Sequence, residues 1–159
     1  DATFDLVYCV NAIHHMAGQQ TFIREARRVL RDGGALAVIG MDPHQQQETW
    51  YVYEYFEGVY ETDLARFPSW ETVLDWMRVA GFRQVERQTV EHIINHKTSE
   101  TVLNDPFLQK HTSSQLALLS DAAYAAGLQR IKAAIVEAKA AGKTLTFPTE
   151  LIMEMVWGF

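Results

Sequence analysis

The chain has 159 residues, of which 48% are hydrophobic and 21% are charged. This composition is typical of a globular domain and excludes a disordered segment or a low-complexity fibre. The net charge of −6 at pH 7 argues against nucleic-acid or membrane-surface binding, since both need basic patches. No apolar run approaches the roughly 20 residues of a membrane span. The single cysteine, Cys9, rules out an internal disulfide and favours a cytoplasmic location.

The first third of the chain predicts a strand, a helix and a second strand. Residues 4–10 (FDLVYCV) are almost continuously apolar, which predicts a strand buried on both faces, as in a parallel sheet. Residues 22–30 repeat apolar side chains at helical spacing, and Thr21 is the expected N-cap. The Gly33-Gly34 pair should end this helix before a strand at 35–39. Short joints between these elements predict a right-handed βαβ crossover.

Two helices are expected next. Residues 44–67 carry many aromatic side chains among glutamates, which predicts a helix with an aromatic face. Ser69 should cap the following helix, which ends at Gly81. Phe82 then falls where a Schellman motif places its hydrophobic contact, against Met77.

The second half of the chain contains one long helix between less regular segments. Ser120 can cap this helix and Gly142 can end it, while Gly127 inside it costs about 1 kcal/mol relative to alanine. Pro148 should interrupt the last strand. Residues 83–94 are expected to form a strand near a sheet edge, and 98–110 a loop. A short helical piece is expected at 114–119, and the last strand at 144–159.

Three runs of sequence carry a family resemblance: FDLVYCVNAIHHM at 4–16, REARRVLRDGGALAVIGMDP at 24–43, and WMRVAGF at 76–82. Their order and spacing resemble the fourth strand, the next helix and fifth strand, and the following helix of class I S-adenosylmethionine-dependent methyltransferases. The small-molecule branch related to the ubiquinone-biosynthesis enzymes is the most similar. The resemblance implies an α/β fold, the C-terminal part of a Rossmann-like methyltransferase sheet. Its strands would be parallel with a C-terminal antiparallel strand, and 99–143 would be a helical insertion.

One part of the family pattern has no counterpart in the sequence. The resembled family binds S-adenosylmethionine through a glycine-rich turn after its first strand and an acidic residue after its second. Glycine allows close approach and the carboxylate binds the ribose hydroxyls, as in dinucleotide folds. The Gly33-Gly34 pair and Gly40 do not qualify, because they do not join a strand to a helix. We therefore expect residues 1–159 to be a single partial domain, lacking a cofactor-binding half of on the order of 100 residues.

The resemblance places cofactor contacts at the end of the first strand, at Cys9, Val10 and Asn11. Ligands of open α/β sheets lie outside the carboxyl ends of the strands. Asn11 can exchange hydrogen bonds with the amino-acid end of S-adenosylmethionine or with the acceptor. A turn residue that satisfies local backbone groups is the alternative interpretation.

His14 and His15 lie one loop further on. A neutral imidazole can remove a proton from an acceptor hydroxyl or amine, which makes His14 the candidate catalytic residue. Methyl transfer needs alignment more than acid–base help, so a structural role in the loop is the alternative.

A substrate pocket is expected to include Asp42 and His44, which follow the second strand, and the aromatic residues Trp50, Tyr51 and Tyr53. A carboxylate at this edge could orient an acceptor, although a capping role for Asp42 is equally compatible with the sequence. Aromatic side chains suit an amphipathic small molecule, and simple core packing is their alternative role.

No metal site is expected. His92 and His96 are four residues apart, which would place them on one face of a helix, but they lie on a predicted strand that runs into a loop. No cysteine or third histidine stands at ligand spacing.

Three hypotheses remain open from the sequence. The complete protein transfers a methyl group from S-adenosylmethionine to a small-molecule acceptor, with the isolated fragment inactive. Alternatively, the chain is a non-catalytic half-fold module for binding or dimerisation, or one half of a split methyltransferase. Because the Phe4–Cys9 strand would be internal in the complete fold, its free edge should make the isolated chain self-associate.

Overall fold

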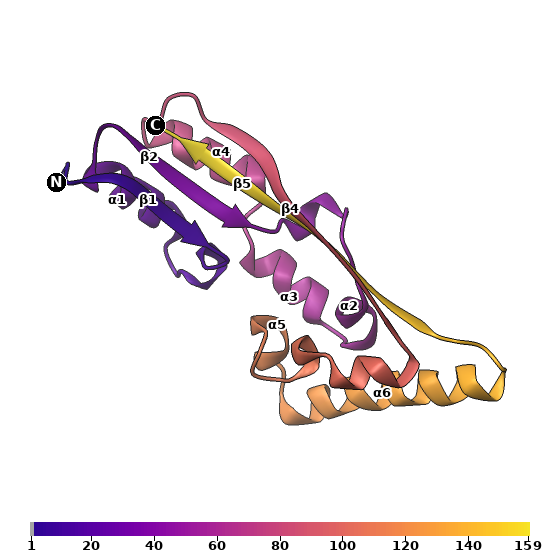
Figure 1. The fold of residues 1–159 in the computed structure, drawn as a ribbon. Coiled ribbons are helices and arrows are strands. Elements are labelled where there is room, and N and C mark those ends of the chain that lie inside the picture. Colours follow the sequence, from indigo (N-terminus) through magenta and orange to yellow (C-terminus); the bar gives the residue numbers. More distant parts are fainter. Residues whose placement is uncertain (1) are drawn as a thin grey trace. The chain divides into compact units, whose positions relative to one another are not determined.

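A computed structural model describes residues 2–159 (Figure 1). The chain forms two compact units, each assembled from separate stretches of sequence. We call them unit 1, which comprises the chain up to Gln47, Leu64–His92 and Ile152–Phe159, and unit 2, which comprises Glu48–Asp63 and Ile93–Leu151. The expected insertion at 99–143 lies within unit 2, and the single-domain boundary remains a prediction.

Unit 1 begins with the predicted βαβ arrangement. Strand β1 (Phe4–Val10) pairs in parallel with β2 (Leu30–Gly40), and helix α1 (Gln19–Val29) connects them. The predicted boundaries of the helix are wrong. Gly18, not Thr21, is the N-cap, and β2 begins directly after Val29. The Gly33-Gly34 pair therefore lies within β2, where Gly33 has a φ of +78° that favours glycine.

The last strand completes the sheet of unit 1. Residues Leu36–Gly40 of β2 pair antiparallel with the second half of β5 (Thr146–Gly158), which confirms the C-terminal antiparallel strand. Contrary to prediction, Pro148 does not interrupt β5. Strand β4 (Glu86–Thr98) pairs with β5, and nearly all of its side chains are exposed, as expected near a sheet edge. The strand order is β1-β2-β5-β3, with β4 beside β5.

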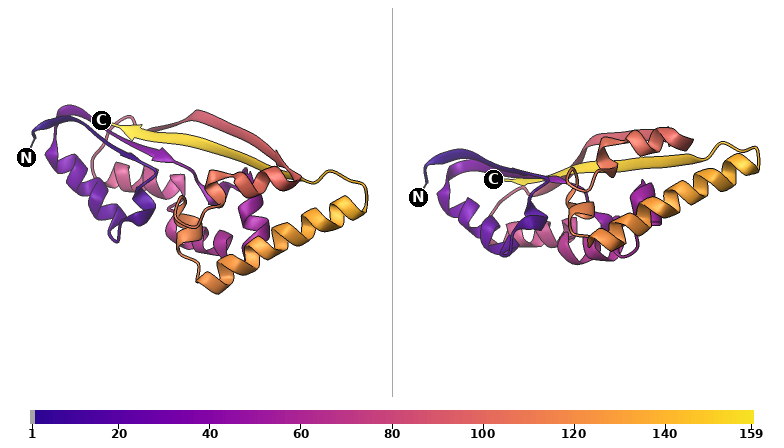
Figure 2. Two further views of the ribbon diagram at one scale, coloured as in Figure 1. Left: turned by 60° about the horizontal axis from the view of Figure 1, so that its bottom comes forward. Right: turned by 90° about the horizontal axis from the view of Figure 1, so that it is seen from below.

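Helix α4 (Trp70–Val79) is bounded as its sequence predicts. The Ser69 side chain accepts a hydrogen bond from the Thr72 N–H, and the Phe82 N–H donates to the Met77 carbonyl at 3.1 Å, which is the long bond of a Schellman motif. Met77 and Phe82 are both buried. The two views of Figure 2 show α1 and α4 on the same side of the unit 1 strands.

The strand register determines which side chains these helices cover. Cys9, Val38 and Val156 form one row across β1, β2 and β5, and all three are buried. The adjacent row faces the opposite side of the sheet, because strand side chains alternate. It contains Tyr8, which is 69% exposed, and Trp157.

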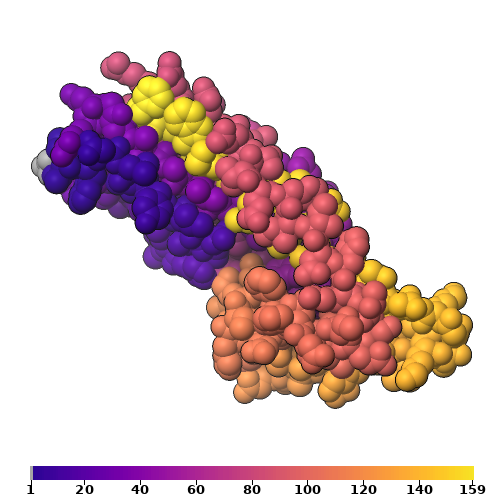
Figure 3. Space-filling model, in the orientation of Figure 1, coloured from indigo at the N-terminus to yellow at the C-terminus, as the bar shows by residue number. Residues whose placement is uncertain are grey.

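The prediction that the first strand is buried on both faces is wrong for this chain. Phe4, Leu6, Tyr8 and Val10 are between 48% and 69% exposed. Figure 3 shows this uncovered face, with the purple β2 between the indigo β1 and the yellow end of β5. We call these four residues of β1 the open face.

Unit 2 is mainly helical. Where one aromatic helix was predicted within 44–67, the structure has a two-residue strand and two short helices, and Gly58 between the helices has a φ of +79°. Several 3-10 turns replace the loop predicted at 98–110. The elements are β3 (Thr49–Trp50), α2 (Tyr51–Tyr55), α3 (Val59–Arg66), η3 (Ser99–Asn104), η4 (Pro106–Leu108), α5 (Ser114–Ala117) and α6 (Asp121–Ala140).

The core of unit 2 explains the glycine within α6. Ser120 caps this helix as predicted, and Ile131 and Ile135 are buried. The Phe56 ring packs so closely on Gly127 that a Cβ there would lie 2.2 Å from a ring carbon. Glycine at this position therefore makes room for an aromatic ring, which offsets its poor helix propensity.

Candidate functional site

The candidate site in unit 1 lies where the parallel strands β1 and β2 end. Asn11 directly follows β1, and its N–H donates to the Ile39 carbonyl at 2.9 Å. Its φ of +47° is in the left-handed region, which asparagine tolerates better than most residues. Its side-chain oxygen would be 3.5 Å from a Cβ on Gly40. The exposed Asn11 amide therefore rests beside the end of β2, at the edge where open α/β sheets bind ligands.

The other two residues predicted to contact the cofactor have different surroundings. Cys9 is 6% exposed and belongs to the core beneath the sheet, and this burial raises the pKa of its thiol. Val10 is 48% exposed on the open face. The two side chains therefore face opposite sides of the sheet.

His14 is part of a short 3-10 helix, η1 (Ile13–His15), which is anchored by the buried Ile13. Its ring stacks on Phe67 at a centroid distance of 3.9 Å and contacts the ring of His15 at 4.1 Å. Burial, with smaller contributions from His15 and Arg66, lowers the pKa of His14 to about 4. His14 is therefore neutral at pH 7 and is a weaker base than an ordinary imidazole.

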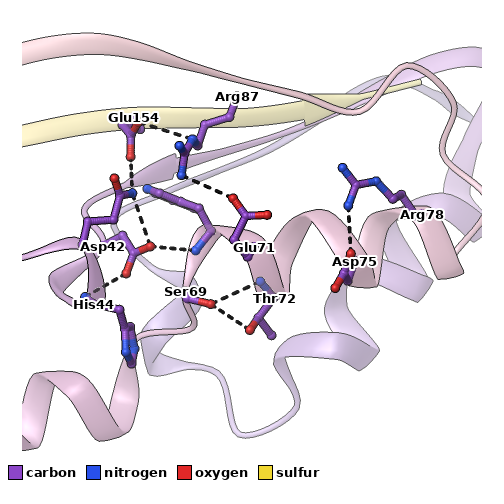
Figure 4. Close-up of polar contacts among 11 residues, drawn as sticks. Asp42, His44, Ser69, Glu71, Thr72, Asp75, Arg78, Arg87 and Glu154 are labelled. Atoms are coloured by element: carbon purple, nitrogen blue, oxygen red, sulfur yellow. Dashed lines mark hydrogen bonds and ion pairs between the residues drawn. The ribbon is translucent and has the colours of Figure 1, made fainter.

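Asp42 connects two elements after β2 (Figure 4). Its carboxylate is 4% exposed and accepts hydrogen bonds from the N–H groups of His44 at 2.9 Å and Trp70 at 2.8 Å. The first bond caps the 3-10 helix η2 (Pro43–Gln45), and the second holds the first residue of α4. This carboxylate thus fixes the loop after β2 against the start of a helix 28 positions later.

Phe67 joins the loops that follow β1 and β2. Its ring carries the stacked His14, while its carbonyl oxygen accepts a hydrogen bond from Nε2 of the exposed His44 at 2.9 Å. The preceding residue, Arg66, accepts a bond at its own carbonyl from the Gln19 side chain at 2.9 Å. Phe67 was missed from the sequence, where its only signal is an aromatic residue directly before the Pro68-Ser69 helix start.

A polar network extends from the loop after β2 to two further strands. Gln45 donates to the Glu154 carboxylate at 2.7 Å, and Arg87 lies 3.6 Å from the same carboxylate. Arg87 also approaches Glu71 of α4 at 3.7 Å, as Figure 4 shows. Glu154 is only 12% exposed, so these partners balance a carboxylate that has lost most of its water.

The three aromatic residues predicted for a substrate pocket lie in unit 2. The Tyr51 hydroxyl donates to Asp105 at 3.0 Å, and the Tyr53 hydroxyl donates to Asp63 at 2.9 Å. Burial and the neighbouring carboxylates raise the pKa of both phenols, which therefore stay protonated as donors. Trp50 contacts the Tyr53 ring edge-on at a centroid distance of 5.3 Å.

The three aromatic residues differ in the exposed fraction of their side chains. Tyr51 is 1% exposed and Trp50 is 7% exposed, so their rings lie within the core of unit 2. Tyr53 is half-buried, with Tyr60 against it at a centroid distance of 5.0 Å. The structure thus brings His14 and His44 together at Phe67 in unit 1, and gathers the aromatic residues separately in unit 2.

Two other features of residues 2–159 concern metal ions and membranes. No group of three histidine, cysteine or acidic side chains there is arranged to hold a metal ion. None of the helices in this range is long and apolar enough to cross a membrane.

Comparison with known proteins matches the start of the chain to one family. Residues 1–38 match the family described as methyltransferase domain. The chain is 50% identical over 38 residues to the 27-O-demethylrifamycin SV methyltransferase of Amycolatopsis mediterranei (strain S699). The matched segment spans 24% of this chain and only 14% of that relative's length.

Solved structures extend the likeness to the whole fold. One is a protein of Anabaena variabilis ATCC 29413 assigned as a methyltransferase of an antibiotic biosynthesis pathway, with a TM-score of 0.66 and 17% identity over 100% of this chain and 68% of that one. Another, assigned as a methyltransferase of Bacillus halodurans C-125, has a TM-score of 0.51 and 22% identity over 99% of this chain and 70% of that one. The chain therefore has the fold of these methyltransferase structures, and its first 38 residues match the methyltransferase domain family.

Proposed function

We propose that the complete protein transfers a methyl group from S-adenosylmethionine to a small-molecule acceptor. The observation that carries this proposal is the family match at residues 1–38, which cover β1, η1, α1 and most of β2. These elements end at the sheet edge where the candidate residues gather. The relative from Amycolatopsis, named for a small molecule, supports an acceptor of that class. The single buried cysteine supports the accompanying proposal of a cytoplasmic location.

The residues at the end of β1 are proposed to contact the cofactor. The exposed Asn11 amide offers both a donor and an acceptor for the amino-acid end of S-adenosylmethionine. The main chain of Cys9 and Val10 would form the wall beside it. Bound there, the cofactor would supply the electrophilic methyl group.

The fit of this chain to the cofactor is incomplete. Gly18, the glycine between β1 and α1, has a φ of −128°, and a Cβ there would meet Thr21 at 3.4 Å. Residues 2–159 contain no glycine-rich turn from a strand into a helix. They supply one side of a cofactor site, and we expect this chain alone to bind S-adenosylmethionine negligibly.

The acceptor is proposed to lie near the loop after β2. His44 is exposed, and its contact with Phe67 orients the ring. Asp42 would act by holding this loop, since its carboxylate already binds two main-chain N–H groups. Neutral His14 can accept a hydrogen bond from an acceptor hydroxyl and orient it, which suits a displacement that depends on alignment. The pocket role predicted for Trp50, Tyr51 and Tyr53 stays a separate proposal for unit 2, where Tyr53 is the most accessible of the three rings.

Cofactor binding tests this proposal. The longest continuous reading frame that contains residues 1–159 would be expressed and titrated with S-adenosylmethionine by calorimetry. We expect micromolar binding by the wild type. Asn11→Ala should weaken it about tenfold, because losing a hydrogen bond to the charged amino-acid end of the cofactor costs about 1.4 kcal/mol or more. Asn104→Ala, at an exposed position of unit 2, is the matched control. Absence of binding by the wild-type protein would refute the proposal.

A second candidate function, a half-fold module for association, is favoured by the open face. Among the described residues, β1 pairs only with β2, so its other edge is free. Phe4, Leu6, Tyr8 and Val10 expose on the order of 500 Å² beside this edge, and two copies together would approach the roughly 1,000 Å² of a specific interface. We propose that the 159-residue chain self-associates through β1, by edge pairing and by covering the open face.

Sedimentation velocity over a range of protein concentrations tests this association. We expect dimers or larger species for the wild type, and a shift to monomer for Leu6→Lys combined with Tyr8→Lys. Val79→Lys, at a residue of α4 that is 79% exposed, adds the same kind of charge outside the open face and should leave association unchanged. A wild-type chain that is monomeric at all concentrations would exclude the module.

A further inference from the structure

A concave site lies at the end of unit 1 opposite to Asn11 and His44. Its cavity of about 430 Å³ is lined by Arg27, Asp32, Gly33, Gly81, Arg83 and Phe159. Arg27 is in the last turn of α1 and Gly33 is near the start of β2. Because β5 is antiparallel to β2, with Leu36 opposite Gly158, Phe159 also belongs to this end. The cavity is therefore at the amino end of β2, away from Asn11 and His44.

Two arginines give this cavity a distinctive charge. Most arginines of the chain, including Arg28, Arg31, Arg78, Arg87 and Arg130, form ion pairs with acidic side chains. Neither Arg27 nor Arg83 has such a partner within residues 2–159. Asp32 lines the same cavity but binds neither guanidinium. The lining therefore carries two guanidinium groups against one carboxylate, although the protein as a whole has a net charge of −6.

The surroundings of Arg27 restrict its guanidinium. The side chain is half-buried, and the guanidinium lies 5.8 Å from the centroid of the Phe82 ring. A position at the end of α1 also favours a cation through the helix dipole, which accounts for one arginine. Arg83 lies in the loop after α4, where its carbonyl accepts a hydrogen bond from the Phe159 N–H at 3.0 Å. The helix dipole of α1 does not explain a second cation there.

The chemistry of the lining defines the ligand. A guanidinium binds phosphate or carboxylate through parallel N–H donors, with geometric specificity that an ammonium lacks. The Phe159 ring is 37% exposed and offers an apolar wall, while Gly33 and Gly81 leave the backbone uncovered. The cavity volume is in the lower part of the range for small-molecule sites. We propose that this cavity binds a small molecule through an oxyanion, phosphate or carboxylate, held by Arg27 and Arg83.

Titration of the 159-residue chain with phenyl phosphate and with benzoate, at constant ionic strength, tests the site. Amide shifts in NMR spectra would report binding. We expect saturable shifts at residues 27, 33, 81 and 83 with at least one of the two probes, and their relative affinities assign the oxyanion. Arg27→Gln and Arg83→Gln should each weaken binding about tenfold. Arg27→Lys, which keeps the charge but not the planar donor pair, should weaken it as well.

Arg24→Gln is the matched control, since it removes an exposed positive charge from the same helix outside the cavity. It should leave the affinity unchanged, and circular dichroism should show that each variant is folded. The proposal is overturned if neither probe gives saturable shifts, or if Arg24→Gln weakens binding as much as Arg27→Gln. This outcome is independent of S-adenosylmethionine binding.

Discussion

The two units differ in how completely their apolar side chains are buried. Unit 2 surrounds its aromatic core with helices, and Phe56, Leu116 and Phe147 are fully buried. Unit 1 covers one face of its strands with α1 and α4 and leaves Leu6 and Tyr8 exposed on the other. The difference shows that the same chain contains one closed core and one sheet that is covered on a single side.

Buried carboxylates also differ between the units. In unit 2, Asp63 and Asp105 accept hydrogen bonds from tyrosine hydroxyls, which links polar groups within an aromatic core. In unit 1, Asp42 accepts bonds from main-chain N–H groups and thereby shapes the loops at the strand ends. In unit 2, Asp105 also accepts a hydrogen bond from the nearby Phe107 N–H at 3.0 Å. What distinguishes Asp42 is that it binds the main chains of two segments that are far apart in the sequence.

The largest expected contrast compares two leucines. Leu116→Ala removes a completely buried side chain from unit 2 and should lower the free energy of unfolding by about 3 kcal/mol. Leu6→Ala truncates a side chain that is 55% exposed in unit 1 and should cost about 0.5 kcal/mol. Urea denaturation of both variants provides the comparison. Equal losses would mean that the open face is covered in solution.

Asp42→Ala should be the next most harmful change. It leaves the N–H groups of His44 and Trp70 without their acceptor, at a cost of about 2 to 3 kcal/mol. Asp75→Ala in α4 is the control, because the ion pair of Asp75 with Arg78 is exposed and should contribute less than about 1 kcal/mol. Urea denaturation would again compare them. A small loss for Asp42→Ala would show that water replaces its bonds.

Gly127→Ala should reverse the usual effect of helix propensity. Alanine ordinarily stabilises a helix interior by about 1 kcal/mol relative to glycine. Here its Cβ would overlap the buried Phe56 ring, so we expect a net loss of about 2 kcal/mol. Thermal unfolding measures the sign directly, and Phe56→Leu combined with Gly127→Ala should recover part of the loss. Stabilisation by Gly127→Ala would contradict the close packing of this ring.

The smallest expected effect is a pH dependence in unit 1. Above pH 6.5, His14 is neutral in both the folded and the unfolded chain. As the pH falls from 6.5 towards 4, the unfolded chain binds a proton that the folded chain does not, because the folded pKa is about 4. Stability should therefore fall over this window by about 1 kcal/mol from His14, after allowance for its partial exposure.

Urea denaturation at several pH values tests this prediction. The difference in free energy of unfolding between the wild type and His14→Gln should change by this amount between pH 7 and pH 4.5. His96→Gln, which removes an exposed imidazole of β4, is the control. If His14→Gln and the wild type have parallel pH profiles, His14 titrates normally in the folded state.

Local sequence signals predicted much of the fold. The βαβ order, the Ser69 and Ser120 caps and the Schellman motif at Phe82 follow from residue types at short spacing, and the structure confirms them. The end of α1 was predicted wrongly, because Gly33 could equally be a helix stop or a position of positive φ within a strand.

The long-range contacts could not be predicted from the sequence. The bond from Trp70 to Asp42 and the fit of Phe56 against Gly127 join distant segments, and nothing in either local pattern specifies the partner. The continuously apolar pattern of β1 predicts that both faces of the strand are buried. It does not show whether a segment of this chain packs against the second face. Asn11, His14, Asp42 and His44 were predicted as site residues because they follow predicted strands and carry polar side chains, while Phe67 has no polar side-chain group that would single it out.

The pairing of β2 with β5 has a consequence for biosynthesis. Leu36 is paired with Gly158, so the sheet of unit 1 is complete only when β2 pairs with β5, which the ribosome synthesises much later. A ribosome adds about 5 to 20 residues each second, and β1, α1 and β2 therefore wait several seconds for their last neighbour. During that interval β2 has an unpaired side, which makes the nascent chain a candidate for chaperone binding until the residues of β5 emerge.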